Sequence, residues 1–317
     1  MSVDTQHQQE RERLEADHTS RRIAELYLHP VEGAFDVAHL REINRRIFQD
    51  LPGAGFPEVT PGEFRPETPA GKDWVKHRQL TGTNIVSNVA YSPMDPASQT
   101  RLAGVLAKID VAELSKLKTA PFVRAIGKLY SELDYIHPFP DGNSRTLREF
   151  TRELAEASGY HIDWTRFART HHGHNALYVA RDLSVNKIAL PQLRSEDTRR
   201  QITFTLDQLA TNRELPDLLR DAVRPGRAIA FSKLKEPEAR AAFPELGKAY
   251  DALRAAEKFG QGKFPGEPLK QKEFVDAVRS TIAERLDAGE TENFRPKMRQ
   301  DRVASRSRPP PSREPER

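Results

Sequence analysis

Hydrophobic residues recur at helical spacing along most of this chain. In residues 36–48, for example, Leu40, Ile43 and Ile47 fall on one face of an amphipathic helix. The same spacing, together with residues that start and stop helices such as Gly159, predicts helices over 1–28, 36–48, 96–108, 120–135, 143–158, 174–184, 190–212, 245–258 and 268–287. The chain is therefore expected to be mainly α, with no repeat of fixed period.

Two stretches depart from the helical pattern. Residues 51–76 contain five prolines and four glycines and are expected to form mostly loop. Residues 79–91 combine β-branched and aromatic side chains with the turn formers Gly82 and Asn84, which predicts a short β-hairpin. The predicted fold class is mainly α with one small β element.

Composition excludes several classes of protein. The chain has 317 residues, 37% hydrophobic and 30% charged, which is typical of a soluble protein of about two domains. It contains no cysteine, so disulfides, thiolate nucleophiles and cysteine-ligated metals are excluded. The sequence shows neither a membrane-spanning apolar run nor the apolar segment of a secretory signal. We therefore expect a cytoplasmic protein with no membrane partner.

Positive charge is concentrated at the C-terminal end. The chain has 50 Lys and Arg against 46 Asp and Glu; residues 295–317 hold eight against three, which leaves 42 against 43 in the rest. This basic, proline-rich composition is typical of a disordered tail, and the near-neutral remainder does not favour a nucleic-acid partner. The expected division is a polar helix at 1–28, a first domain at 29–195, a helical C-terminal region of unknown role at 196–294 and the tail at 295–317.

The segment His137-Pro-Phe-Pro-Asp-Gly-Asn-Ser-Arg-Thr-Leu-Arg148 carries candidate chemistry. A helix is expected to end at the His-Pro pair, and the next helix to start near Asn143 after a tight turn. The free N–H groups and the dipole of that helix start favour an anion. Arg145 and Arg148 can add charge-assisted hydrogen bonds, and His137 is a base with an ordinary pKa near neutrality. This arrangement predicts transfer of a phosphorus-centred group to a hydroxyl.

The same segment resembles the signature of the Fic (filamentation induced by cAMP) family, H-x-F-x-[D/E]-G-N-x-R-x-x-R. All seven specified positions match, at His137, Phe139, Asp141, Gly142, Asn143, Arg145 and Arg148. The resemblance extends more weakly over residues 20–190 and identifies 29–195 as a Fic domain. It implies a Fic-type helical bundle with the 79–91 hairpin as a substrate-aligning flap.

The resemblance implies a protein adenylyltransferase, a nucleotidyltransferase that moves AMP from Mg-ATP to a Ser, Thr or Tyr hydroxyl of a target protein. It implies that His137 is the catalytic base and Asp141 the ligand of Mg²⁺. Phe139 would bury the loop against the core. The phosphates of ATP would be bound by Gly142, Asn143, Ser144, Arg145 and Arg148.

Position 144 departs from the pattern, because adenylylating members often carry glycine where this chain has Ser144. The serine narrows the room for the phosphate chain, so a Fic-type phosphotransferase or other phosphate-group transferase is an alternative. A catalytically silent binding module, in which residues 196–294 and the tail supply the function, is a second alternative. The adenylyltransferase would act as a toxin or as an effector secreted into a recipient or host cell.

Two kinds of protein partner follow from the resemblance. The target would bind through the flap around 79–91 by strand addition. Regulation in the family uses a Ser/Thr-x-x-x-Glu helix, and this spacing occurs only weakly here, at Ser232 to Glu236 and Ser280 to Glu284. The expected inhibitor is therefore a separate small antitoxin protein.

Overall fold

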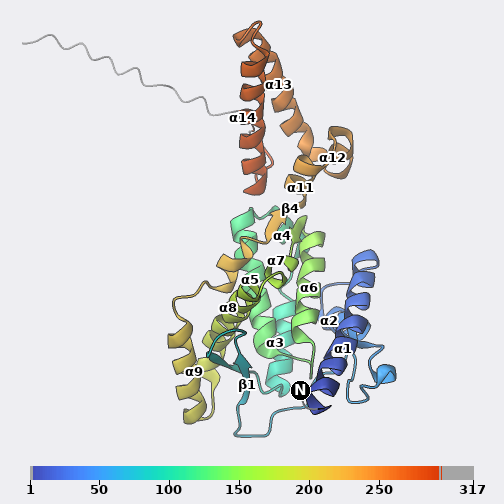
Figure 1. Ribbon diagram of the computed structural model, residues 1–317, viewed down its shortest axis with the longest axis vertical. Coiled ribbons are helices and arrows are strands. Elements are labelled where there is room, and N and C mark those ends of the chain that lie inside the picture. Colours follow the sequence, from blue (N-terminus) through green and yellow to red (C-terminus); the bar gives the residue numbers. More distant parts are fainter. Residues whose placement is uncertain (1–2, 293, 295–317) are drawn as a thin grey trace, which may run out of the picture.

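The computed structural model describes residues 3–292 and 294, and these residues are mainly helical (Figure 1). The lower body in Figure 1 contains α1 (Val3–Leu28), α2 (Val37–Phe48), α3 (Pro96–Leu106), α4 (Val111–Lys116), α5 (Thr119–Ile136), α6 (Asn143–Ala157), α7 (Thr165–Ala168), α8 (His171–Ala189), α9 (Glu196–Leu209) and α10 (Leu215–Leu219). The upper lobe contains α11 (Gly226–Lys233), α12 (Glu236–Ala242), α13 (Gly247–Lys263) and α14 (Pro268–Asp287). No helix in the described part of the chain is both long and apolar enough to span a bilayer.

Helices α5 and α6 form the centre of the larger hydrophobic core. Phe122, Ile126 and Leu133 of α5 are fully buried, as are Leu147 and Phe150 of α6. Helices α2, α8 and α10 pack around this pair, and the core continues along the chain as far as Val223. The amphipathic spacing seen in the sequence therefore directs one face of each helix toward α5 and α6.

The predicted hairpin is present, but its first strand begins earlier than the sequence indicated. Strand β1 (Trp74–Gln79) pairs antiparallel with β2 (Val86–Tyr91), and Trp74 lies opposite Tyr91. The start of β1 falls inside the stretch expected to be loop. Its sequence, Trp-Val-Lys-His-Arg-Gln, has little apolar alternation, so pairing with β2 rather than intrinsic preference defines this strand.

A second small sheet, absent from the sequence-based prediction, lies where the two lobes meet. Strand β3 (Tyr160–Ile162) pairs antiparallel with β4 (Val223–Pro225), and both have only three residues. Three residues cannot display alternation, which explains why the pattern did not reveal them. Arg224 of β4 also forms an ion pair with Asp287 at 2.7 Å, which connects this sheet to the end of α14.

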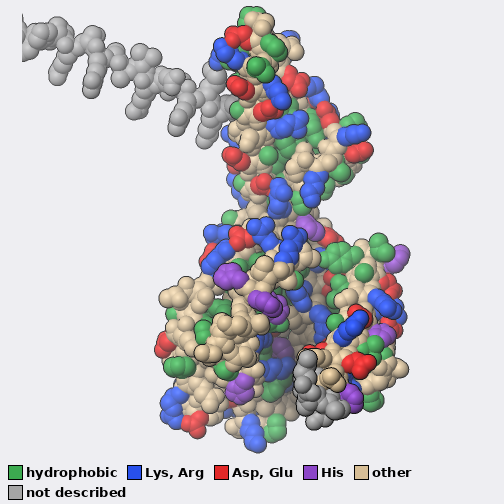
Figure 2. All heavy atoms as spheres, in the orientation of Figure 1, with side chains coloured by type: hydrophobic (Ala, Val, Ile, Leu, Met, Phe, Trp, Pro, Cys, Tyr) green, Lys and Arg blue, Asp and Glu red, His purple; other side chains and the backbone are tan. Residues whose placement is uncertain are grey.

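The upper lobe has a hydrophobic core of its own. This core includes Phe231, Tyr250, Leu253 and Ile282, and Figure 2 shows a narrow waist between this lobe and the body. The domain edge expected at 195/196 remains a prediction. In the structure, α9 and α10 pack on the body, and the second core begins only at Ala228. The predicted disorder of residues 295–317 lies outside the described residues.

Local signals account for several helix ends. The Asp36 side chain accepts a hydrogen bond from the His39 N–H at 2.9 Å and so caps α2. Helix α6 ends at Ala157, and Gly159 follows with φ of 77°, as predicted. Helix α8 is longer than expected, and the short helices α4, α7 and α10 were not predicted because one or two turns display no clear period.

Candidate active site

The candidate chemistry lies in the six-residue connection between α5 and α6. His137 ends α5 in the left-handed region with φ of 49°, and Gly142 precedes α6 with φ of 73°. The Asn143 side chain accepts from the Phe139 N–H at 3.0 Å and donates to the Phe139 carbonyl at 2.7 Å. Phe139 is fully buried, as predicted. The loop is thus closed on itself and anchored in the core.

Gly142 is required for a reason the sequence could not show. A Cβ atom at this position would lie 1.9 Å from Cζ of Phe48, and φ is positive. The resemblance implies that Gly142 helps bind the phosphates, and the structure adds that the space at its Cβ is taken by an α2 ring. Phe48 therefore packs directly beneath the start of α6.

The His137 ring is enclosed on several sides. Its centroid is 3.9 Å from that of Tyr91 and 5.3 Å from that of Trp74. Nε2 lies 3.4 Å from Nζ of Lys76, and Nδ1 lies 3.5 Å from a carboxylate oxygen of Asp134. Burial lowers the pKa of His137 to about 4, although Asp134 opposes the shift. His137 is therefore neutral at physiological pH and able to accept a proton.

A cavity of about 330 Å³ opens beside His137 at the first turn of α6. This volume is within the range of small-molecule sites. Five cationic side chains line it, and no carboxylate is among the described residues that do so; the full lining is Lys76, Arg78, His137, Gly142, Asn143, Ser144, Arg145, Arg148, Tyr178 and Arg181. Figure 2 shows Lys and Arg side chains in the hollow between the two sides of the body. The charge and the α6 N-terminus both favour a polyphosphate.

The two motif arginines are held differently. Arg145 forms an ion pair with Glu15 of α1 and donates to the Thr19 hydroxyl at 3.0 Å. Arg148 donates from Nε to the Ser144 carbonyl at 3.1 Å, and burial lowers its pKa. Arg148 therefore carries a desolvated charge without an ion-pair partner among the described residues, which favours an anionic ligand.

Asp141 is exposed and lies next to the cation-lined cavity rather than in its lining. It lines a smaller neighbouring cavity of about 160 Å³ with Glu15 and Glu58, and partial burial raises its pKa, an effect that Lys76 opposes. The described residues contain no cluster of three or more acidic or histidine ligands. Mg²⁺ commonly uses one or two carboxylates together with substrate phosphates, so Asp141 fits a metal that binds with the nucleotide.

Four residues around the loop were missed by sequence reasoning. Lys76 and Arg78 come from β1, Asp134 from α5 and Arg181 from α8. Only Asp134 had a readable signal, because a residue three positions before the end of a helix lies on the same face as that end. The others reach the site through pairing and packing between distant segments.

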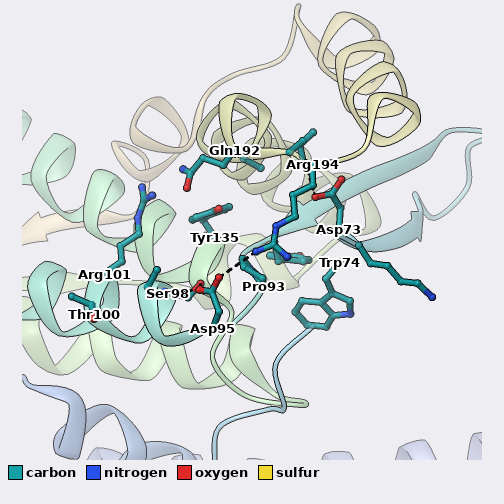
Figure 3. A pocket seen from close by; sticks show the side chains of 15 residues that line it. Asp73, Trp74, Pro93, Asp95, Ser98, Thr100, Arg101, Tyr135, Gln192 and Arg194 are labelled. Carbon is teal, nitrogen blue, oxygen red and sulfur yellow. Dashed lines mark hydrogen bonds and ion pairs between the residues drawn. The ribbon is translucent and has the colours of Figure 1, made fainter. Parts of the chain in front are cut away.

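A second cavity lies on the other side of Trp74 and Tyr91 and is shown in Figure 3. It has a volume of about 520 Å³, and an ion pair between Arg194 and Asp95 crosses it at 3.3 Å. Asp73 in this lining accepts hydrogen bonds from the Arg194 and Ser195 N–H groups, and Arg101 is paired with Glu132. The smaller cavity beside His137 differs from this one because its described lining has five cationic side chains and no carboxylate.

The weak regulatory motifs lie away from this site. Glu236 forms ion pairs with Arg240 and Arg254, and Glu284 lies on α14. Both belong to the upper lobe in Figure 1. Within the part of the chain that the structure describes, neither carboxylate contacts Arg145 or Arg148.

Comparison with known proteins gives a consistent family match. Residues 34–155 match the model of the Fic/DOC family. Over 159 residues the chain is 30% identical to the protein adenylyltransferase VbhT of Bartonella schoenbuchensis, covering 50% of this chain and 29% of VbhT. A protein adenylyltransferase of Bartonella henselae is 26% identical over 132 residues, covering 41% and 23%. The chain thus spans less than a third of the length of these relatives.

Several solved structures with partial similarity come from the genus Bartonella. One is the BepC effector protein of Bartonella tribocorum with bound AMPPNP, at 15% identity and a TM-score of 0.44 over 68% of this chain and 88% of that one. Another is the N-terminal Fic domain of an effector protein of Bartonella sp. AR 15-3. It has 20% identity and a TM-score of 0.43, covering 68% and 82%.

Proposed function

Because the chain carries a domain of the Fic/DOC family over residues 34–155, we propose that it is a protein adenylyltransferase. The observation that carries this proposal is the position of His137: it lines a cavity with five cations at the N-terminus of α6, and its Nε2 lies 3.4 Å from Nζ of Lys76, one of those cations. A neutral base beside a polyphosphate site is what transfer of a phosphate group to a hydroxyl requires.

In this proposal the phosphates of ATP bind over the first turn of α6. The N–H groups of Asn143 and Ser144 face the phosphates, and Arg148 neutralises charge on the leaving pyrophosphate. Asp141 would hold Mg²⁺, which supplies charge neutralisation on the phosphate oxygens. His137 removes the proton from the target hydroxyl as that oxygen attacks the α-phosphorus and the bond to pyrophosphate breaks.

The target segment would pair with β1 rather than β2. The outer side of β2 is occupied, because Asn186 accepts from the Ala90 N–H at 3.1 Å and donates to the Asn88 carbonyl at 2.8 Å. Within the described residues the sheet has two strands, so β1 provides the open edge for strand addition. An extended target segment on that edge would pair with the strand that carries Lys76, whose Nζ lies 3.4 Å from Nε2 of His137.

The test is labelling of lysate proteins by the purified chain with radiolabelled ATP and Mg²⁺. Label from the α-phosphate should appear on protein, and His137→Ala should reduce it by roughly 10²- to 10⁴-fold, the usual contribution of a general base. Undiminished labelling by His137→Ala would exclude His137 as the base. Absence of label on protein from both the α-phosphate and the γ-phosphate of ATP would favour the catalytically silent binding module.

Transfer of γ-label would instead support a phosphotransferase, the alternative suggested by Ser144. Its hydroxyl is held by Arg181 at 2.9 Å, so it occupies room at the first turn of α6. Action as a toxin or secreted effector, and control by a separate antitoxin protein, remain predictions. Expression of the wild type and His137→Ala in bacteria, scored by growth, tests the toxin prediction.

A further inference from the structure

Asp134 lies behind the proposed base, on the side of His137 away from the cavity. The Nδ1 atom of His137 is 3.3 Å from the backbone carbonyl oxygen of Asp134 and 3.5 Å from its carboxylate oxygen Oδ1. The opposite nitrogen, Nε2, lies 3.4 Å from Nζ of Lys76 at the cavity. The two ring nitrogens therefore have different surroundings, an acceptor pair at Nδ1 and a cation at Nε2.

The Asp134 carboxylate is itself held by a buried arginine. Arg181 of α8 donates from Nε to Oδ2 and from Nη2 to Oδ1, both at 2.9 Å. Asp134 is 1% exposed and Arg181 2%. Burial opposes ionisation of Asp134, but the charge and hydrogen bonds of Arg181 outweigh it and hold the pKa of Asp134 below its usual range. A bidentate pair also fixes the orientation of the carboxylate.

Arg181 connects this pair to the anion site. Its third contact is the hydroxyl of Ser144, at 2.9 Å from Nη1, and both residues line the cavity beside His137. One guanidinium thus joins the last turn of α5 to the first turn of α6. The same side chain therefore fixes the position of the α5 turn that carries the base relative to the first turn of α6.

We propose that Asp134 is a positioning residue that keeps the proton of neutral His137 on Nδ1, and that Arg181 holds Asp134 ionised and correctly oriented. The inference rests on the proposed function, in which Nε2 accepts the proton of the target hydroxyl. With Nδ1 protonated, the lone pair of Nε2 is directed toward the cavity. During transfer Nε2 gains the hydroxyl proton, and the Asp134 carboxylate stabilises the imidazolium until that proton passes to solvent.

The test reads the tautomer of His137 directly, by nitrogen NMR of ¹⁵N-histidine-labelled full-length protein near pH 7.5. The signal is assigned by its loss in His137→Gln. Wild type should carry the proton on Nδ1, and Asp134→Asn should move it wholly or partly to Nε2. The same variant should lower kcat for AMP transfer by roughly 10²- to 10⁴-fold with little change in KM for ATP.

A matched control comes from another buried carboxylate. Glu149 of α6 is 4% exposed and accepts from Nε of Arg152 at 2.9 Å, but it does not contact His137. Glu149→Gln should leave the tautomer and kcat unchanged. If Asp134→Asn does not fold because Arg181 is left unpaired, the double variant Asp134→Asn/Arg181→Met removes both charges and should show the same tautomer change.

Two outcomes would overturn the inference. One is a wild-type His137 already protonated on Nε2. The other is a variant without the Asp134 carboxylate that keeps the Nδ1 tautomer, which would show that the backbone carbonyl alone suffices. The NMR result does not depend on AMP transfer, so failure of the proposed function would be recognised separately from failure of this inference.

Discussion

Arg65 donates a hydrogen bond from Nε to the backbone carbonyl of His137 at 2.8 Å. The same guanidinium contacts the Ser92 carbonyl at 2.5 Å and the Ile136 carbonyl at 3.4 Å. Arg65 is buried, and its neighbours at this point are carbonyls and the ring of Trp74, 3.8 Å away. It therefore satisfies the last carbonyls of α5 and holds His137 in its left-handed conformation.

Replacement of Arg65 should remove a contact that holds His137 in place, although Arg65 itself does not line the cavity. Arg65→Leu leaves buried carbonyls without donors, at a cost of about 1–3 kcal/mol for a buried group, and should lower both the thermal midpoint and the labelling rate. Arg41→Leu is the matched control, because Arg41 is exposed and donates to the Gly62 carbonyl at 2.7 Å. Equal effects of the two substitutions, measured by thermal denaturation and labelling, would contradict the role assigned to Arg65.

Gly142→Ala should be more damaging than an alanine at another left-handed glycine. Both Gly142 and Gly159 have positive φ, but a Cβ at Gly142 meets Phe48 while none of the surrounding atoms lies within 4 Å at Gly159. Each substitution carries a backbone cost of about 1–2 kcal/mol, and overpacking adds roughly 1–3 kcal/mol at Gly142 alone. Denaturant unfolding of both variants measures the difference in their free energies of unfolding. Similar decreases in the two variants would show that the Phe48 ring moves aside at little energetic cost.

Substitutions of the two motif arginines should have different effects, Arg148→Ala on ATP binding and Arg145→Ala on the packing of α1 as well. Arg148 has no ion-pair partner in the described part of the chain, so Arg148→Ala removes a desolvated charge. It should weaken ATP binding by roughly 10- to 100-fold, as expected for a charge-assisted hydrogen bond, with little change in the thermal midpoint. Arg145→Ala breaks contacts to Glu15 and Thr19 and should loosen α1 as well. Calorimetric titration with ATP checks the first expectation, and unchanged affinity for Arg148→Ala would place the phosphates elsewhere.

His137 should remain unprotonated over most of the working pH range. Burial lowers the pKa of His137 to about 4. Asp134 from its own helix opposes this shift, whereas Lys76 from β1 and Arg181 from α8 add to it. The neighbouring phenol of Tyr91 stays neutral because burial raises its pKa. An NMR titration of His137 should therefore show no protonation between pH 8 and 5.5. A midpoint near the ordinary histidine pKa of about 6.5 would show that burial does not dominate the ionisation of this ring.

The same pKa shift makes a prediction about stability. The unfolded chain binds a proton at His137 below about pH 6.5, while the folded chain does not until about pH 4. The free energy of unfolding should therefore fall as pH falls through this window, by about 2 kcal/mol at pH 5 from this group. His137→Gln should lose less stability between pH 7.5 and 5 than wild type in denaturant titrations.

The separate hydrophobic cores predict where the chain can be shortened. A fragment of residues 1–225 keeps the whole larger core, which includes Val223, and should unfold cooperatively and retain labelling activity. A fragment of residues 1–195 lacks Leu215 and Leu219, both fully buried in that core, and should be markedly less stable. Equal stability of the two fragments would support a domain edge at 195 instead.

Sequence alone was sufficient for the features encoded by neighbouring residues. The contiguous segment from His137 to Arg148 contains the helix end, the turn and the helix start, so these three features could be predicted from local preferences. The amphipathic helices were also readable, because a helix buries a face whose period is visible over a dozen residues. Together these determined the fold class and the family resemblance.

Tertiary structure decided the surroundings of the base. Lys76, Arg65 and Arg181 are 61, 72 and 44 positions from His137 along the chain, and only packing of the hairpin, the 51–76 loop and α8 against α5 brings them to it. The ionisation of Asp134 and of His137 likewise depends on burial, which no short segment possesses by itself. Long-range contacts of this kind form only when the core closes, so local pattern locates the loop, while the assembled core holds its backbone and determines its electrostatics.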